Sequence, residues 1–182
     1  MIELARYLRD EVPLADTVAA FAGDEDRLWP AWQAVVAAAV AGGDTDRDRL
    51  VALLVALGES GRAWFGAVLR ESWDVYCPPE GSAADWARLN DFAARLTAAG
   101  IDFLTYAVWT LRDALESTGT VPPDLRPAVA PWFEHCGRML HDACAAGEQR
   151  PYTAVGAFAA REGVPGPGFS VARWDFWQRR RA

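Results

Sequence analysis

The 182-residue chain has no lysine, only two histidines and only three cysteines. All 18 basic residues are therefore arginine, which is typical of a GC-rich coding bias and indicates little about function. Three cysteines without CxxC spacing exclude a disulfide framework and favour a reducing, cytoplasmic setting. Cys136, His141 and Cys144 do not converge on one side of a helix, as zinc ligands must, so we expect no metal and no cofactor.

Several functional motifs are also missing. The sequence has no glycine-rich phosphate loop, no GxSxG and no HExxH, which argues against the enzyme classes that depend on them. No apolar run is long enough for a membrane span, and the first residues, MIELARYLRDEVPL, lack the apolar core of a signal peptide. Because no such apolar run is present, we expect no membrane partner.

The net charge of -7 argues against a broad nucleic-acid footprint.

Apolar residues recur at helical spacing along nearly the whole chain, and alternating strand-like runs are absent. The pattern predicts an all-α fold, a single compact multi-helix domain over residues 1–182 with a C-terminal docking helix. The expected helices cover residues 2–9, 14–22, 30–40, 45–57, 62–76, 83–97, 102–116, 127 or 131 to 145, 153–161 and 171–180.

Nine tryptophans are unusual for a chain of this length. They favour packing of the core and of the helix contacts, and the alternative is an aromatic-lined ligand pocket. In the expected 62–76 helix, Trp64, Val68 and Val75 share one side, next to the main apolar stripe.

Two positions set polar groups against apolar helix faces, where they must be paired or used. Asn90 falls inside the apolar stripe of the 83–97 helix, as a core amide or as a group that orients a ligand. Arg112 and Glu116 are four residues apart and are expected to pair, either as a surface salt bridge or along a cleft beside Trp109. In a cleft, Glu116 would bind a cation or act as a base.

The C-terminal segment GFSVARWDFWQRRR predicts a short helix capped by Ser170. Trp174 and Trp177 lie one turn apart and would dock this helix, and Arg173 is placed for a cation–π contact with Trp177. The final arginines, residues 179–181, are either a solvated, frayed end or a local basic patch.

Three segments together resemble a mainly fungal family that long carried only an unknown-function label. They are WARLNDFAARLTAAGIDFLTYAVWTLRDALE, PWFEHCGRML and GFSVARWDFWQRR, within residues 86–181. Some members of that family are cyclodipeptide synthases that use aminoacyl-tRNAs, one of them carrying arginine. The matched positions are Asn90, Arg95, Arg112, Glu116, Arg173, Trp174 and Trp177.

The resemblance implies a small biosynthetic enzyme that forms amide bonds from activated amino acids. Glu116 and Asn90 are then the expected catalytic residues. The expected substrate-binding residues are Arg95, Trp109, Arg112, Arg173, Trp174 and Trp177. The implied partners are aminoacyl-tRNA and an amino-acid substrate, and a homodimer stays open. The alternative is a non-catalytic helical binding protein with an aromatic-lined pocket.

Overall fold

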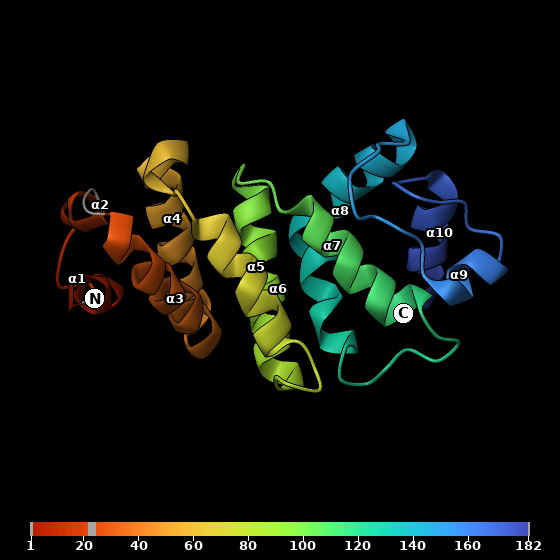
Figure 1. Ribbon diagram of the computed structural model, residues 1–182, viewed down its shortest axis with the longest axis horizontal. Coiled ribbons are helices and arrows are strands. Elements are labelled where there is room, and N and C mark those ends of the chain that lie inside the picture. Colours follow the sequence, from red (N-terminus) through yellow and green to blue (C-terminus); the bar gives the residue numbers. More distant parts are fainter. Residues whose placement is uncertain (1, 22–24, 182) are drawn as a thin grey trace. The chain divides into compact units, whose positions relative to one another are not determined.

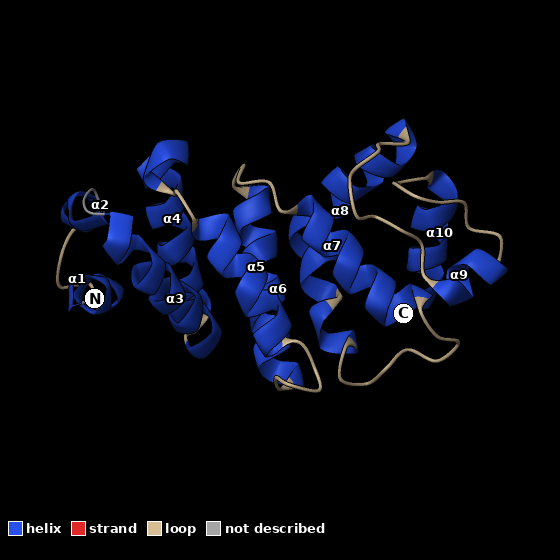
Figure 2. Cartoon of the chain, in the orientation of Figure 1, coloured by secondary structure: helices blue, strands red, loops and turns tan. Residues whose placement is uncertain are grey.

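The computed structural model describes residues 2–21 and 25–181, and within these ranges every regular element is helical (Figures 1 and 2). The predicted all-α class is confirmed. The chain divides into two compact units, Met1–Gly81 and Ser82–Ala182. The assignment of residues 1–182 to a single domain stays a prediction.

The first unit is built from five described helices, and its core lies around the indole of Trp32. The helices are α1 (Ile2–Leu8), α2 (Leu14–Phe21), α3 (Glu25–Ala41), α4 (Asp44–Gly61) and α5 (Phe65–Tyr76). Trp32 is fully buried, its ring packs on Phe21 and Phe65, and its Nε1–H donates to the Ala63 carbonyl at 2.7 Å. This tryptophan therefore packs the core and also satisfies a polar backbone group.

Helix α3 begins earlier than the sequence predicts. Pro30 was expected in the first turn, but the helix starts at Glu25 and Pro30 lies inside it. A proline near a helix start interrupts only the early hydrogen bonds, so the backbone tolerates one more turn before it. The stretch between the expected 14–22 and 30–40 helices falls partly outside the described residues, and Glu25 and Asp26 belong to α3.

The predicted break at residues 58–61 is a kink rather than an end. Gly58 has φ 66° and ψ -178°, and the α4 helix continues to Gly61. Trp64 then adopts the left-handed conformation, with φ 65°, immediately before α5. A bulky residue at positive φ is an outlier that the surrounding structure must hold in place.

The second unit contains the remaining helices and carries all the predicted catalytic and substrate-binding residues. They are α6 (Ala83–Ala98), α7 (Leu104–Leu111), η1 (Arg112–Glu116), η2 (Arg126–Ala128), α8 (Ala130–Ala146), α9 (Ala157–Arg161) and α10 (Val171–Arg180). The predicted Ser170 cap is confirmed, because the Ser170 hydroxyl accepts from the Arg173 N–H at 3.1 Å. Ser82 caps α6 in the same way and accepts from the Asp85 N–H at 3.1 Å.

The end of the expected 102–116 helix changes its winding. α7 is α-helical, but Arg112–Glu116 forms a turn of π-helix. The Ser117 hydroxyl donates to the Arg112 carbonyl at 3.0 Å, which gives that carbonyl a partner. A π turn holds more residues than an α turn, so side chains four apart no longer lie above one another.

Charge is divided unevenly between the two units. Residues 1–81 hold 14 acidic and 7 basic side chains, whereas residues 82–182 hold 11 of each. The whole net charge of -7 therefore belongs to the first unit, and the objection to anionic ligands does not extend to the second. Among the described helices, none combines the length and the apolar character that a bilayer span requires.

Candidate functional site

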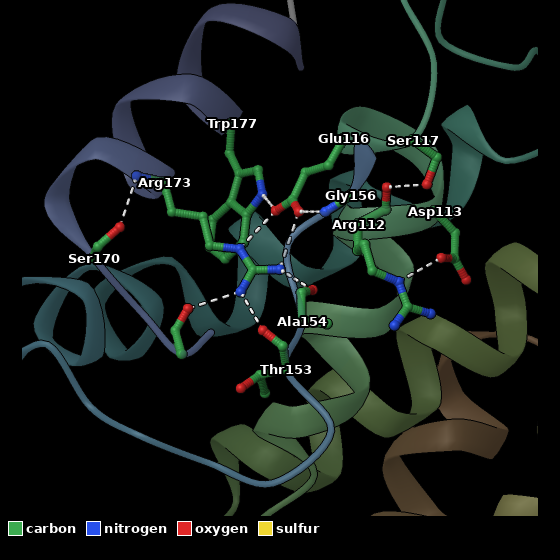
Figure 3. Close-up of polar contacts among 11 residues, drawn as sticks. Arg112, Asp113, Glu116, Ser117, Thr153, Ala154, Gly156, Ser170, Arg173 and Trp177 are labelled. Carbon is green, nitrogen blue, oxygen red and sulfur yellow. Dashed lines mark hydrogen bonds and ion pairs between the residues drawn. The ribbon is translucent and has the colours of Figure 1, made fainter. Parts of the chain in front are cut away.

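The Glu116 carboxylate lies in the interior of the second unit, where its side chain is 0% exposed (Figure 3). Its Oε1 accepts from Arg173 Nε and from Trp177 Nε1, both at 2.6 Å. Its Oε2 accepts from the Gly156 N–H at 2.8 Å and from an Arg173 Nη2 hydrogen at 3.0 Å. Each oxygen thus receives two hydrogen bonds, which uses the full acceptor capacity of a carboxylate.

Arg173 is satisfied to the same degree. Besides its two bonds to Glu116, the guanidinium donates from Nη1 to the carbonyls of Thr153 and Gly168, at 2.8 and 2.7 Å. Its Nη2 also donates to the Ala154 carbonyl at 3.0 Å. All five N–H donors of the side chain are used, and the cluster joins the π turn, the 153–168 segment and α10 (Figure 3).

The predicted Arg112–Glu116 pair is wrong. Arg112 Nε instead binds Asp113 at 2.7 Å, in a partly exposed pair that points away from Glu116 (Figure 3). The π turn explains the difference, because it rotates Glu116 out of the α-helical register with Arg112 and into the core. Glu116 instead binds the guanidinium of Arg173. The predicted cation–π contact of Arg173 is present, with its Cζ 5.3 Å from the centroid of the Trp177 ring.

Asn90 is a core amide that ties three helices together. Its Oδ1 accepts from Thr110 Oγ1 at 2.6 Å and from Trp132 Nε1 at 2.7 Å, and its Nδ2 donates to the Trp86 carbonyl at 2.9 Å. The side chain is fully buried. Of the two interpretations of Asn90, the structure matches the core amide.

Arg95 lies in a separate charged cluster on the flank between α6 and α8. Its Nε binds Asp91 Oδ2 at 2.8 Å, and the other carboxylate oxygen, Oδ1, lies 2.8 Å from His135 Nε2. These three side chains are partly buried. This cluster was not predicted from the sequence, although Asp91 and Arg95 show the four-residue spacing of a helical ion pair.

The two remaining predicted aromatic residues lie at different places. Trp109 donates its indole N–H to the Tyr152 carbonyl at 2.9 Å, and its ring contacts Tyr106. Trp174 packs against Phe133 and His141 of α8, which docks α10 as expected. The predicted site residues therefore do not converge on one cavity.

The terminal arginines are held against the protein rather than frayed. Arg180 donates to the carbonyls of Gly119 and Thr118, at 3.0 and 2.8 Å, and its guanidinium lies 4.7 Å from the Phe158 ring centroid. Arg181 lies over the Phe133 ring at 4.5 Å. The solvated-end interpretation is wrong for Arg180, because aromatic and carbonyl groups bind its charge.

An open groove lies where the start of α8 meets the end of α10, with a volume of about 820 Å³. Its lining residues are Arg126, Pro127, Val129, Ala130, Phe133, Glu134, Gln178 and Arg181. The groove combines an aromatic ring and small apolar side chains with two guanidinium groups, one carboxylate and one amide. Such a mixture suits a ligand with an apolar body and a charged end.

This groove was not predicted from the sequence. Its signals are weak, because Phe133 and Arg126 are separated from Arg181 by about 50 residues and no helical period links them. The close contact at Gly156 was not predicted either. A Cβ at this position would lie 2.6 Å from backbone and side-chain atoms of Glu116. Close approach of two segments depends on the tertiary structure, and a single glycine in the sequence does not predict it.

The cysteines do not form a reactive centre. Burial raises the pKa of the Cys136 thiol and of the Cys144 thiol to about 11, so both are protonated at neutral pH. Among the described residues, no group of three or more His, Cys, Asp or Glu side chains is arranged to hold a metal ion.

Comparison with known proteins identifies a family. No curated protein and no solved structure matches the chain. A family model matches residues 32–181, which covers most of both units. The chain therefore belongs to the family described as protein of unknown function (DUF3632).

Proposed function

We propose that this chain is a non-catalytic binding protein whose ligand, an organic anion with an apolar body, occupies the groove between α8 and α10. The observation that carries the proposal is the Arg181 guanidinium over the Phe133 ring at the groove wall. A cation held on an aromatic face can still bind a carboxylate or phosphate through its edge. Val129 and Pro127 supply apolar surface for the body of the ligand.

The state of the predicted catalytic groups supports a binding role. Glu116 accepts four hydrogen bonds, and Asn90 is bonded on both its oxygen and its nitrogen. A base needs a free lone pair within reach of the proton that it takes. In this arrangement neither side chain offers one, whereas the groove is open to solvent.

The test is titration calorimetry with 1-naphthoate, its neutral amide and the cation 1-naphthylmethylammonium. We expect the naphthoate to bind most tightly, and Arg181→Gln to weaken it by about tenfold, as loss of one charge-assisted contact should. The matched control is Arg179→Gln, because Arg179 is exposed in the last turn of α10, two residues before Arg181, but does not line the groove. Equal binding of the cation, or equal loss in both variants, would contradict the proposal.

A second candidate is the enzyme implied by the resemblance, which forms cyclic dipeptides from aminoacyl-tRNAs in the manner of the mainly fungal arginine-containing synthases. The charge layout favours it, because the second unit is neutral overall and Arg126 and Arg181 lie at one groove. Arginines at such a place would meet tRNA phosphates.

This candidate predicts a new cyclic dipeptide in a host that expresses the chain, detected by mass spectrometry. The Arg126→Gln/Arg181→Gln variant should abolish the product, while Arg179→Gln should retain it. A product that persists in the groove variant would exclude the groove as the tRNA site. No new metabolite, together with naphthoate binding, would favour the non-catalytic protein.

A further inference from the structure

The first unit exposes apolar side chains along α5. Val75 is 62% exposed and Trp64, which immediately precedes the helix, is 58% exposed. A single exposed apolar side chain is ordinary, but one that lines a groove can mark a binding surface. Trp64 is also held at φ 65°, a conformation that costs a bulky residue free energy and that clusters at functional positions.

A groove of about 210 Å³ lies between α3 and α5, and Val75 lines it. Its lining residues are Gln33, Val36, Val68, Glu71, Ser72, Val75 and Tyr76. Val36 and Val68 are buried and form apolar surface inside the groove, whereas Glu71 and Val75 are exposed. Val68, Glu71 and Val75 follow one another at spacings of three and four residues, so they share one face of α5.

The charge of this unit indicates what would cover the groove. Residues 1–81 hold twice as many acidic as basic side chains, and Glu71 places one carboxylate in the groove itself. A groove between two packed helices accepts the ridge of a third, with apolar anchors at helical spacing. Positive side chains on that helix would face Glu71, and the excess of acidic side chains in this unit would attract them.

We infer that the α3–α5 groove binds a basic amphipathic helix of a partner protein. An apolar side chain of that helix lies over the buried Val36 and Val68 and packs against Val75. Its lysine or arginine side chains pair with Glu71. This surface lies wholly in the first unit and does not depend on the function proposed for the α8–α10 groove.

The test uses the full chain and labelled peptides of about 18 residues, long enough to form an isolated helix. One peptide places leucine on one helix face and lysine on the other, a second replaces every lysine with glutamate, and a third shuffles the leucine and lysine order. Fluorescence anisotropy at physiological salt measures their affinities. We expect the first peptide to bind at least about tenfold more tightly than the other two.

Two variants locate the binding. Val75→Asp and Glu71→Arg should each weaken the leucine–lysine peptide by about tenfold. The matched controls are Val171→Asp, a 57% exposed valine in the second unit, and Glu59→Arg, an exposed acidic residue elsewhere in the first unit. Both controls should bind the peptide as the unmodified chain does, and circular dichroism should show all four variants folded.

The following results would overturn the inference. Equal binding of the glutamate peptide would show that positive charge is not required. Equal binding of the shuffled peptide would show that an apolar helix face is not required. An equal loss in Glu59→Arg and Glu71→Arg would mean unspecific attraction to an acidic surface. A chain that dimerises in light scattering, and that Val75→Asp makes monomeric, would identify the occupant as a second copy of this chain.

Discussion

Glu116 and Arg173, 57 residues apart in the sequence, form a two-point ion pair in which both side chains are 0% exposed. Trp177 and the Gly156 N–H complete the shell of the carboxylate. The pair holds the π turn at the end of α7 to α10, so this buried charge cluster attaches the C-terminal helix in addition to the packing of Trp174 on α8.

Removing either partner of this pair should strongly destabilise the second unit. Glu116→Gln and Arg173→Met each leave a buried group without its counter-charge, and we expect a loss of about 3–5 kcal/mol in the free energy of unfolding. Urea denaturation followed by tryptophan fluorescence measures it. The control is Arg112→Met, whose partly exposed pair with Asp113 should contribute less than about 1 kcal/mol. Similar losses of unfolding free energy in Arg112→Met and Arg173→Met would contradict the stabilising role of the buried Glu116–Arg173 pair.

The buried position of Glu116 affects how activity measurements on Glu116→Gln are interpreted. Because Glu116→Gln should disturb the fold, loss of a product in this variant would not by itself identify a catalytic residue. The groove arginines are the better choice for that purpose, since Arg181 is exposed at the surface.

Gly156→Ala should also destabilise the chain. The added Cβ would lie 2.6 Å from the Glu116 carbonyl carbon, and that backbone must move for the methyl group to fit. We expect a loss of about 1–3 kcal/mol, measured by thermal unfolding. In Gly137→Ala, which has open space around its Cβ in the interior of α8, the same change should stabilise by about 0.5–1 kcal/mol. A neutral Gly156→Ala would mean that the close contact is absent.

Asn90→Ala should cost about 2 kcal/mol or more, because Trp132 Nε1 and Thr110 Oγ1 would both lose their buried acceptor. Thr110→Val removes a single donor and leaves the Trp132 bond in place, so its effect should be smaller. Urea denaturation of both variants gives the comparison. If Asn90→Ala were fully stable but bound no ligand, the amide would have a functional role rather than a structural one.

Cys136 and Cys144 should resist alkylation in the native state. Their buried thiols have pKa values of about 11, and the reactive thiolate is scarce at pH 8. Iodoacetamide should therefore modify Cys77, which is only half-buried, well before the other two, as intact-mass spectrometry would show. In denaturant all three cysteines should react. Rapid native modification of Cys144 would show that α8 opens readily.

The same two thiols should make stability fall at high pH. Their pKa is about 11 in the folded chain against an ordinary value of 9.0, so between these values the unfolded state loses protons that the folded state keeps. The stabilisation is complete below pH 9 and is lost as the pH rises to 11, at up to about 1.4 kcal/mol per thiol and pH unit. Urea denaturation at pH 7, 9 and 11 measures it, and Cys136→Ala/Cys144→Ala should flatten the dependence.

Much of the local structure follows from the sequence because its causes are local. Ser170 caps its helix as predicted, and Ser82 does the same for α6, since a cap needs only a hydroxyl and an N–H three residues away. The stripe of Leu104, Val108 and Leu111 is buried because its spacing matches one helix face. These features, and with them the all-α class, were available from residue spacing alone.

The partners of the charged groups were decided only by the tertiary structure. Spacing placed Arg112 beside Glu116, but a single π turn rotated Glu116 inward, where Arg173 supplies the counter-charge from far along the chain. Burying a carboxylate is so costly that it must find the partner that the whole fold provides. Sequence therefore determined which helices form, whereas packing between distant segments decided that Glu116 anchors α10 and that Phe133 and Arg181 share a groove.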